Sequence, residues 1–274
     1  MYDLKVKDFF GLEETKGNIG IEVETEFDGP FSGIDSSPNT TKYWKDTKDN
    51  SLKGYSTEYV LKKPVNYKSV PEVVNILCKH INSLESNMKP SIRTGIHIHI
   101  NMQDSLIKDV FKFLIVYYCL ETILTNNCGE NRQGNLFCLR TRDAEYVIEQ
   151  LKMAVTADDI YLLRTDDLRY TSLNIQSLFS FGSLELRSLA TTKNLDNIVE
   201  WAEVLKSIKT FAENTYSCWD CVSSISLLGP DEWMRKVLGD EITKKFWYKG
   251  AENDIMSDVR NLQMLCHILS QKGI

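Results

Sequence analysis

The ten residues Asn18 to Phe27, NIGIEVETEF, decide the fold because apolar and polar side chains alternate along them. A period of two is typical of a β-strand, in which successive side chains point to opposite faces of the sheet. One face of this strand is mostly apolar, and the other face carries Glu22, Glu24 and Glu26. The pattern therefore predicts a sheet with one face in the core and an acidic opposite face.

Four other stretches have related patterns. Residues 92–101, IRTGIHIHIN, set isoleucines that include Ile92 against Arg93, His97 and His99. Three more strands are predicted in YTSLNIQSL (170–178), in GSLELRSLA (182–190) and, with a weaker pattern, in YSTEYVLK (55–62). Two-faced strands of this kind favour an antiparallel or mixed sheet whose apolar side is covered by helices.

Amphipathic helices are predicted between and after the strands by apolar spacings of three and four residues. One helix begins with a capping box at Ser69 and Glu72, with Pro71 between them, and its apolar stripe ends at Leu84. The others span residues 104–125, 143–155, 195–216 and 253–270. The helix at 104–125 is apolar on most sides, so we expect it at the centre of an α+β fold.

Two long irregular stretches interrupt this pattern. Residues 28–54 are rich in Gly, Ser, Pro, Asn and Asp, and a loop of this length is typical of a functional segment such as a lid. Residues 126–142 are locally basic because of Arg132, Arg140 and Arg142. No linker separates two domains, so we expect a single domain over residues 1–274.

Composition excludes several classes of protein. The chain has 32 basic and 38 acidic residues, and its net charge of −6 without a dense basic face argues against a nucleic-acid partner. The longest apolar run, Phe113 to Leu120, is far shorter than the ~20 residues that cross a bilayer, so no membrane association is expected. The first ten residues, MYDLKVKDFF, lack the apolar segment of a signal peptide, which predicts a cytoplasmic protein.

The seven cysteines are scattered, as in a protein of a reducing compartment. Cys218 and Cys221 form one CxxC pair, but no second pair completes a zinc site. We therefore expect two partly buried thiols rather than a metal or redox centre.

The polar faces of the predicted strands carry candidate metal ligands. Glu22 and Glu24 lie about 7 Å apart on one face, where two like charges repel unless a cation lies between them. The same spacing recurs in two other strands, at His97 and His99 and at Glu185 and Arg187. If these strands are neighbours, an oxygen-rich ligand set suited to Mg²⁺ or Mn²⁺ results. The alternative is a salt-bridged polar face with two solvent-exposed histidines.

Five motifs occur along the chain in a defined order. They are GIEVE (Gly20–Glu24), GYSTE ending at Glu58, TGIHIH (Thr94–His99), RYTSLN (Arg169–Asn174) and SLELR ending at Arg187. This ordered set resembles the amidoligase family, a branch of the carboxylate–amine ligases related to glutamine synthetase and glutamate–cysteine ligase. The resemblance spans residues 19–201, includes WKDTKDNSL (44–52), and leaves 202–274 as a helical C-terminal part.

The resemblance implies a fold and a set of site residues. The implied fold is a glutamine-synthetase-like curved, mostly antiparallel sheet backed by helices, with the active site on the concave face. By the same resemblance, one metal is held by Glu22, Glu185 and His97, and a second metal by Glu24 and Glu58. ATP would be contacted by His99, Arg169, Asn174 and Arg187, of which the two arginines would also serve catalysis.

The resemblance also implies a reaction. It is the ATP-dependent joining of a carboxylate substrate to an amine acceptor through an acyl phosphate, with two divalent cations. For the amine step, Glu26 or Asp49 is a candidate to accept a proton. Relatives include both small assemblies and large rings, so an oligomer is compatible with this expectation. Two alternatives are a metal-dependent hydrolase and a non-catalytic metal- or nucleotide-binding protein.

Overall fold

One mostly antiparallel sheet forms the centre of the motif-bearing region. The structure, a computed structural model, describes residues 1–89, 91–129, 132–136 and 138–274. In these residues seven strands form a sheet in the order β2-β3-β1-β5-β7-β6, and β4 pairs with β1. The strands are β1 (Ile19–Phe27), β2 (Trp44–Thr47), β3 (Tyr55–Leu61), β4 (Met88–Lys89), β5 (Gly95–Asn101), β6 (Leu173–Asn174) and β7 (Ser183–Ala190).

Strand β1 has the two faces that its sequence predicts. Ile19, Ile21, Val23 and Phe27 are buried in the core, with antiparallel β3 and β5 on either side of the strand. The other face carries the glutamates. Apolar burial therefore determines which face of the sheet is left for polar side chains.

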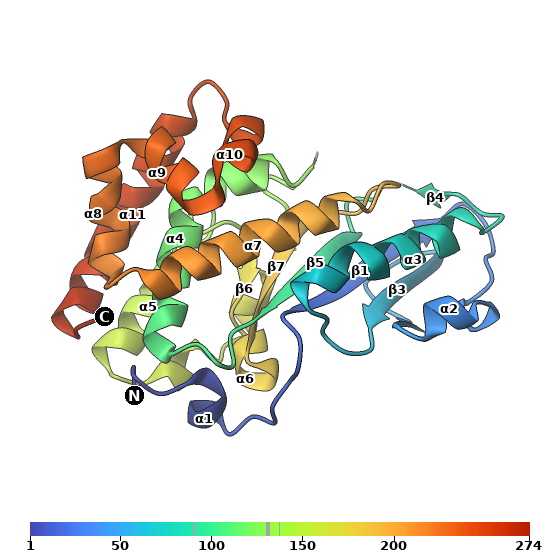
Figure 1. Ribbon diagram of the computed structural model, residues 1–274, viewed down its shortest axis with the longest axis horizontal. Helices are drawn as coiled ribbons and strands as arrows, with labels where there is room; N and C mark the ends of the chain where they lie inside the picture. Colours follow the sequence, from blue (N-terminus) through green and yellow to red (C-terminus); the bar gives the residue numbers. More distant parts are fainter. Residues whose placement is uncertain (90, 130–131, 137) are drawn as a thin grey trace.

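Helices cover the apolar face of the sheet. Helices α3 (Val70–Asn82) and α7 (Asn197–Asn214) contact each other, α7 also contacts β5, and both lie across the same side of the sheet (Figure 1). The short helices include α1 (Val6–Phe10), α2 (Pro38–Thr41), which contacts β2, and α6 (Ser177–Phe181), which contacts β7. The α+β class and the helical backing of the sheet are thus confirmed.

A helical region lies beside the sheet (Figure 1). Helix α4 (Ile107–Asn126) is buried along nearly its whole length, as its sequence predicts. It packs against α7, α8 and α11. The helices around it are α5 (Tyr146–Thr156), α8 (Cys218–Leu228), α9 (Pro230–Leu238), α10 (Asp240–Phe246) and α11 (Ala251–Gln271). Cys218 and Cys221 are buried in α8, and burial raises the pKa of both thiols, so they serve packing.

Three local predictions were wrong. The Ile92 side chain is 62% exposed and precedes β5, so it does not belong to the core. The predicted strand at 170–178 contains only Leu173 and Asn174, because the Asn174 side chain accepts a hydrogen bond from the Gln176 N–H and α6 begins at Ser177.

The capping box at Ser69 was the third. A 3₁₀ turn (Tyr67–Ser69) leads directly into α3, so Ser69 has a helical backbone and its side chain does not cap the helix. Glu72 instead accepts a hydrogen bond from the Tyr43 hydroxyl at 3.2 Å.

The first irregular stretch contains more structure than predicted. Residues 28–54 include α2 and strand β2, whose Trp44 is fully buried and donates a hydrogen bond from Nε1 to the Val73 carbonyl at 3.0 Å. This part of the stretch is an edge of the sheet, so the stretch as a whole is not a free lid. In the second stretch, residues 130, 131 and 137 lie outside the described residues. None of the described helices has both the length and the apolar character needed to cross a membrane.

Candidate active site

The register of four strands aligns the acidic and imidazole side chains. Glu22 on β1 lies opposite His97 on β5, and Glu24 lies opposite Glu58 on β3. On the other side of β5, His99 lies opposite Glu185 on β7. Since these positions face the polar side of the sheet, the pairing brings residues from four separate motifs together.

The first group of potential ligands is formed by Glu22, His97 and Glu185. Their ligand atoms all lie within 4.8 Å of one another. His97 Nδ1 is 3.1 Å from Glu22 Oε2 and 3.3 Å from Glu185 Oε1. Three groups of this type, converging on one point, could hold a divalent cation.

The second group contains Glu24, Glu58 and again His97, with ligand atoms within the same 4.8 Å. His97 Nε2 faces Glu24 Oε1 at 3.8 Å, while the Gly95 N–H donates to Glu24 Oε2 at 2.7 Å. The Thr47 hydroxyl donates to Glu58 Oε2 at 2.9 Å. The imidazole of His97 therefore lies between the two groups, with one nitrogen directed at each.

Burial and mutual repulsion shape the charge of these carboxyls. Burial raises the pKa of Glu24, and burial together with the charge of Glu22 raises the pKa of Glu58. Burial acts in the same direction on Glu22 and Glu185, but neighbouring cationic groups outweigh it and hold the pKa of both below the usual value; for Glu22 these groups are His97 and His99. A cation placed among the four carboxylates would favour the charged form of each.

Three predicted ATP-contacting residues lie at the edge of the first group. Arg187 Nη1 donates to Glu185 Oε1 at 2.6 Å, and its buried Nε has no hydrogen-bond partner among the described residues. The Asn174 side-chain amide donates to Glu185 Oε2 at 2.6 Å. His99 Nε2 lies 3.4 Å from Glu22 Oε1, and its Nδ1 lies 3.1 Å from Ser183 Oγ. These contacts orient Glu185 and Glu22 while leaving the Arg187 Nε available to another acceptor.

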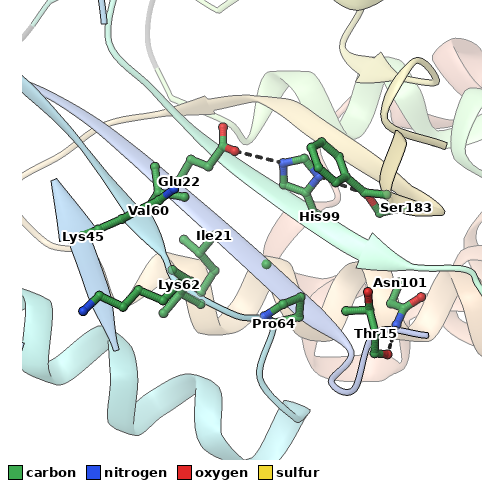
Figure 2. Close-up of a pocket in the computed structure, with 13 residues that line it drawn as sticks. Thr15, Ile21, Glu22, Lys45, Val60, Lys62, Pro64, His99, Asn101 and Ser183 are labelled. Carbon is green, nitrogen blue, oxygen red and sulfur yellow. Dashed lines mark hydrogen bonds and ion pairs between the residues drawn. The ribbon is translucent and has the colours of Figure 1, made fainter. Parts of the chain in front are cut away.

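A cavity of about 330 Å³ opens beside the first group. Glu22 and His99 form one end of it and are drawn facing each other in Figure 2. Apolar side chains of the wall include Val60, Leu61 and Pro64. Further lining residues are Lys45, Lys62 and Phe181, whose ring meets the His99 ring edge-on at a centroid distance of 6.2 Å. The cavity is thus lined by both apolar and cationic side chains, and it borders the carboxylate cluster at Glu22.

The remaining predicted residues lie farther from the centre. Glu26 Oε1 accepts from the Lys53 N–H at 3.0 Å, and Asp49 Oδ1 accepts from the Ser51 N–H at 2.7 Å. The charge of Asp49 acts on the pKa of Glu24, which places Asp49 on that side of the cluster. Arg169 is exposed on a 3₁₀ turn with its guanidinium over the Tyr170 ring, and within the described residues no contact links it to the cluster.

Sequence reasoning did not identify several residues that support the cluster. Thr47 and Ser183 act through single hydroxyls, for which the sequence contains no signal. Arg132 donates to the carbonyls of Thr94 and Ser188, beside the cluster, and the only indication of it was the basic composition of residues 126–142.

Comparison with known proteins identifies a family. No curated protein matches the chain. A family model described as "putative amidoligase enzyme" matches residues 33–209, which is more than half of the 274 residues. The match contains every motif of the cluster except GIEVE on β1, which precedes its first residue. The chain therefore belongs to the amidoligase family and is a ligase-type enzyme.

Proposed function

We propose that the protein is an ATP-dependent carboxylate–amine ligase that forms an amide bond through an acyl phosphate and uses two Mg²⁺ or Mn²⁺ ions. The observation that carries the proposal is the pair of three-residue groups that share His97 beside a cavity and Arg187. We further propose a glutamine-synthetase-like fold, built as a single domain over residues 1–274, with the reaction on the polar face of the sheet.

The donor set suits two hard divalent cations. Each group offers two carboxylates and one imidazole, a mixture that Mg²⁺ and Mn²⁺ accept. A neutral histidine ligates through one nitrogen, so we assign His97 Nδ1 to the metal held by Glu22 and Glu185. Its Nε2–H is then directed at Glu24, a ligand of the second metal with Glu58, and acts as an orienting hydrogen-bond donor. When bound, such ions neutralise phosphate charge and polarise the phosphoryl group.

The cavity beside Glu22 is the proposed ATP site. Its apolar wall at Val60, Leu61 and Pro64 suits a nucleobase, and Glu22, which lines the cavity beside His99, belongs to the first metal group. We assign contacts with the phosphate oxygens to His99 and to Arg187, whose buried Nε has no partner within the described part of the chain. Arg169 is exposed, and within the described residues no contact links it to the cluster. Its predicted contact with phosphate therefore adds little support to the proposal.

Two chemical steps follow from this arrangement. A carboxylate oxygen of the substrate attacks the γ-phosphorus, the bond from phosphorus to the β–γ bridging oxygen breaks, and ADP leaves. The guanidinium of Arg187 stabilises the charge that develops on the transferred group. The amine then attacks the acyl carbon, and phosphate leaves. The proton lost by the nitrogen goes to Glu26 or Asp49, which lie on the side of the cluster opposite the ATP cavity.

The direct test is phosphate release from ATP and Mg²⁺ in the presence of amino acids and amines. The proposal requires release that depends on both an acid and an amine, with an amide product identified by mass spectrometry. Release without any acceptor would instead identify a metal-dependent phosphohydrolase. ATP binding without release under any mixture would identify a binding protein.

Glu24→Ala tests the assignment of the second metal. The variant should lose turnover and bind ATP more weakly in the presence of Mg²⁺, because one of two carboxylates in that group is removed. Its thermal unfolding should stay close to wild type, since burial already opposes the charged form of Glu24. Glu203→Ala on α7, where the carboxylate forms a surface ion pair with Lys206, is the matched control. Full activity of Glu24→Ala would refute the metal role of this residue.

A further inference from the structure

A β-bulge lies at the centre of the candidate active site. In the pairing of β5 with β7, Ile96 is opposite Leu189 and Ile98 is opposite Leu186. His97 on β5 therefore faces two residues of β7, Arg187 and Ser188. A bulge of this kind interrupts the ladder of hydrogen bonds, bends the strand and changes the direction of its side chains. Here it sets where Arg187 lies relative to His97, the residue common to both ligand groups.

One buried guanidinium binds the carbonyl groups of this bulge. Arg132 donates from Nη2 to the Arg187 carbonyl at 2.6 Å and from Nε to the Ser188 carbonyl at 2.8 Å. Its Nη1 donates to the Thr94 carbonyl, just before β5, at 3.4 Å. Only 4% of Arg132 is exposed, and these bonds join β7 at the irregularity to the residue that precedes β5. Arg132 thus replaces ladder hydrogen bonds that the bulge removes.

The same guanidinium lies next to the proposed ligands of the second metal. A Cβ added to Gly95 would meet Arg132 Nη2 at 3.2 Å, Glu24 Oε2 at 3.4 Å and His97 Nε2 at 3.4 Å. Three functional groups therefore surround one point that only glycine leaves open. The Glu24 carboxylate is itself held by the Gly95 N–H, which donates to its Oε2 at 2.7 Å.

We infer that Arg132 is a positioning residue of the active site. Its guanidinium holds the β7 bulge so that His97 serves both ligand groups and Arg187 projects toward the transferred phosphoryl group. The catalytic consequence rests on the proposed function, whereas the holding of the bulge does not. The fixed fork of five N–H donors is what the role requires, because three carbonyls in different directions must be satisfied together.

The experiment compares Arg132→Lys and Arg132→Met with wild type. Mn²⁺ binding, followed by electron paramagnetic resonance, should weaken by about 10- to 100-fold in both variants, as for the loss of other groups that orient metal ligands. Backbone amides at 96–98 and 187–189 should exchange hydrogen faster, while those of α11 keep their protection. Arg142→Met is the matched control, because Arg142 belongs to the same basic stretch but contacts Asp254 and Thr122.

Chemical rescue separates positioning from general destabilisation. In Arg132→Ala, added guanidinium ion at a concentration too low to denature the protein should restore Mn²⁺ binding and the slow exchange of the bulge. Urea at the same concentration should not, because it lacks the charge. Wild-type Mn²⁺ affinity in the Lys and Met variants, or unchanged exchange at 96–98 and 187–189, would overturn the inference.

The two proposals fail in distinguishable ways. If wild type forms no amide with any acid and amine, the ligase proposal fails, but hydrogen exchange still decides whether Arg132 holds the bulge. If amide forms normally in Arg132→Lys and Arg132→Met, the ligase proposal stands and the role of Arg132 is refuted.

Discussion

His97 is the residue that links the two ligand groups, because its two ring nitrogens face different carboxylates. Nδ1 lies near Glu22 and Glu185, and Nε2 faces Glu24. The sequence predicts that His97 shares a strand face with His99, and the motif order predicts its metal role. Which nitrogen faces which carboxylate depends on the pairing of β5 with β1 and β7, which the spacing within one strand does not determine.

Arg187→Lys tests the role of a planar cation at the phosphoryl group. The variant keeps the charge but loses the Nε donor and the fixed geometry of the guanidinium. We expect kcat to fall by about 100-fold or more, as on removal of one transition-state donor, with a much smaller change in the Kd for ATP. Single-turnover phosphate release and ATP titration measure the two quantities.

The control for this substitution is Arg235→Lys, because Arg235 on α9 forms surface ion pairs with Asp231 of the same helix and with Asp240 at the start of α10. Equal losses of ATP binding and turnover in Arg187→Lys would mean that Arg187 only binds the nucleotide. No change in either quantity would place Arg187 in a structural ion pair with Glu185.

The sequence of strand β1 predicts which of its side chains lie in the core and which in the candidate site. Its alternation predicts both the buried face and the acidic face, and its pairing on both edges makes it central in the site. Strand β2 was missed because its four residues lie within a polar stretch and only Trp44 reaches the core. The C-terminal part was predicted to be helical, but α8, α9 and α10 were not predicted individually, since short helices separated by Gly229 and Gly239 give no long periodic pattern.

Helix α4 places an acidic group in the core, and this predicts a pH dependence of stability. Glu121 is 2% exposed and accepts hydrogen bonds from the Thr141 N–H at 2.8 Å and from the hydroxyls of Thr141 and Ser172. Burial raises the pKa of Glu121 to about 7. Between its ordinary value of 4.5 and about 7, the folded protein keeps a proton that the unfolded chain releases.

The stabilisation that Glu121 contributes is therefore fully present below its unfolded pKa and is lost as pH rises through about 7. From the size of this pKa shift, the loss of the Glu121 contribution should lower the free energy of unfolding by about 3 kcal/mol. Urea unfolding at about pH 5 and about pH 8 measures the difference. Glu121→Gln should flatten the dependence by that amount, while the buried Asp258, whose pKa is raised to about 6, still contributes in both proteins. An identical slope in Glu121→Gln would contradict the prediction.

At the scale of the whole molecule, the C-terminal helices complete the core that the matched family region begins. The family model ends at residue 209, but α4 within it packs against α8 and α11 beyond it. Residues 218–274 should therefore be needed for folding, even though they contribute no residue to the candidate site.

Removal of residues 218–274 should leave a chain that aggregates and shows no cooperative thermal unfolding, because the apolar faces of α4 would be exposed. A milder change tests the same packing. Leu262→Ala, at a buried position of α11, should cost about 2–5 kcal/mol, whereas Met264→Ala, at an exposed position, should change stability by less than about 0.5 kcal/mol. A monomeric, cooperatively folding truncated protein would contradict the prediction.

The sequence by itself determined the two-faced strands, the central buried helix, the α+β class and the ordered motifs of the family. These features follow from local periodicity and residue type, which are properties of short segments. Only the tertiary structure decided that His97 lies between two groups of carboxylates, that β7 bulges opposite it, and that Arg132 binds the bulge. The physical reason is that strand register, bulges and contacts between distant segments depend on how separate parts of the chain pack together.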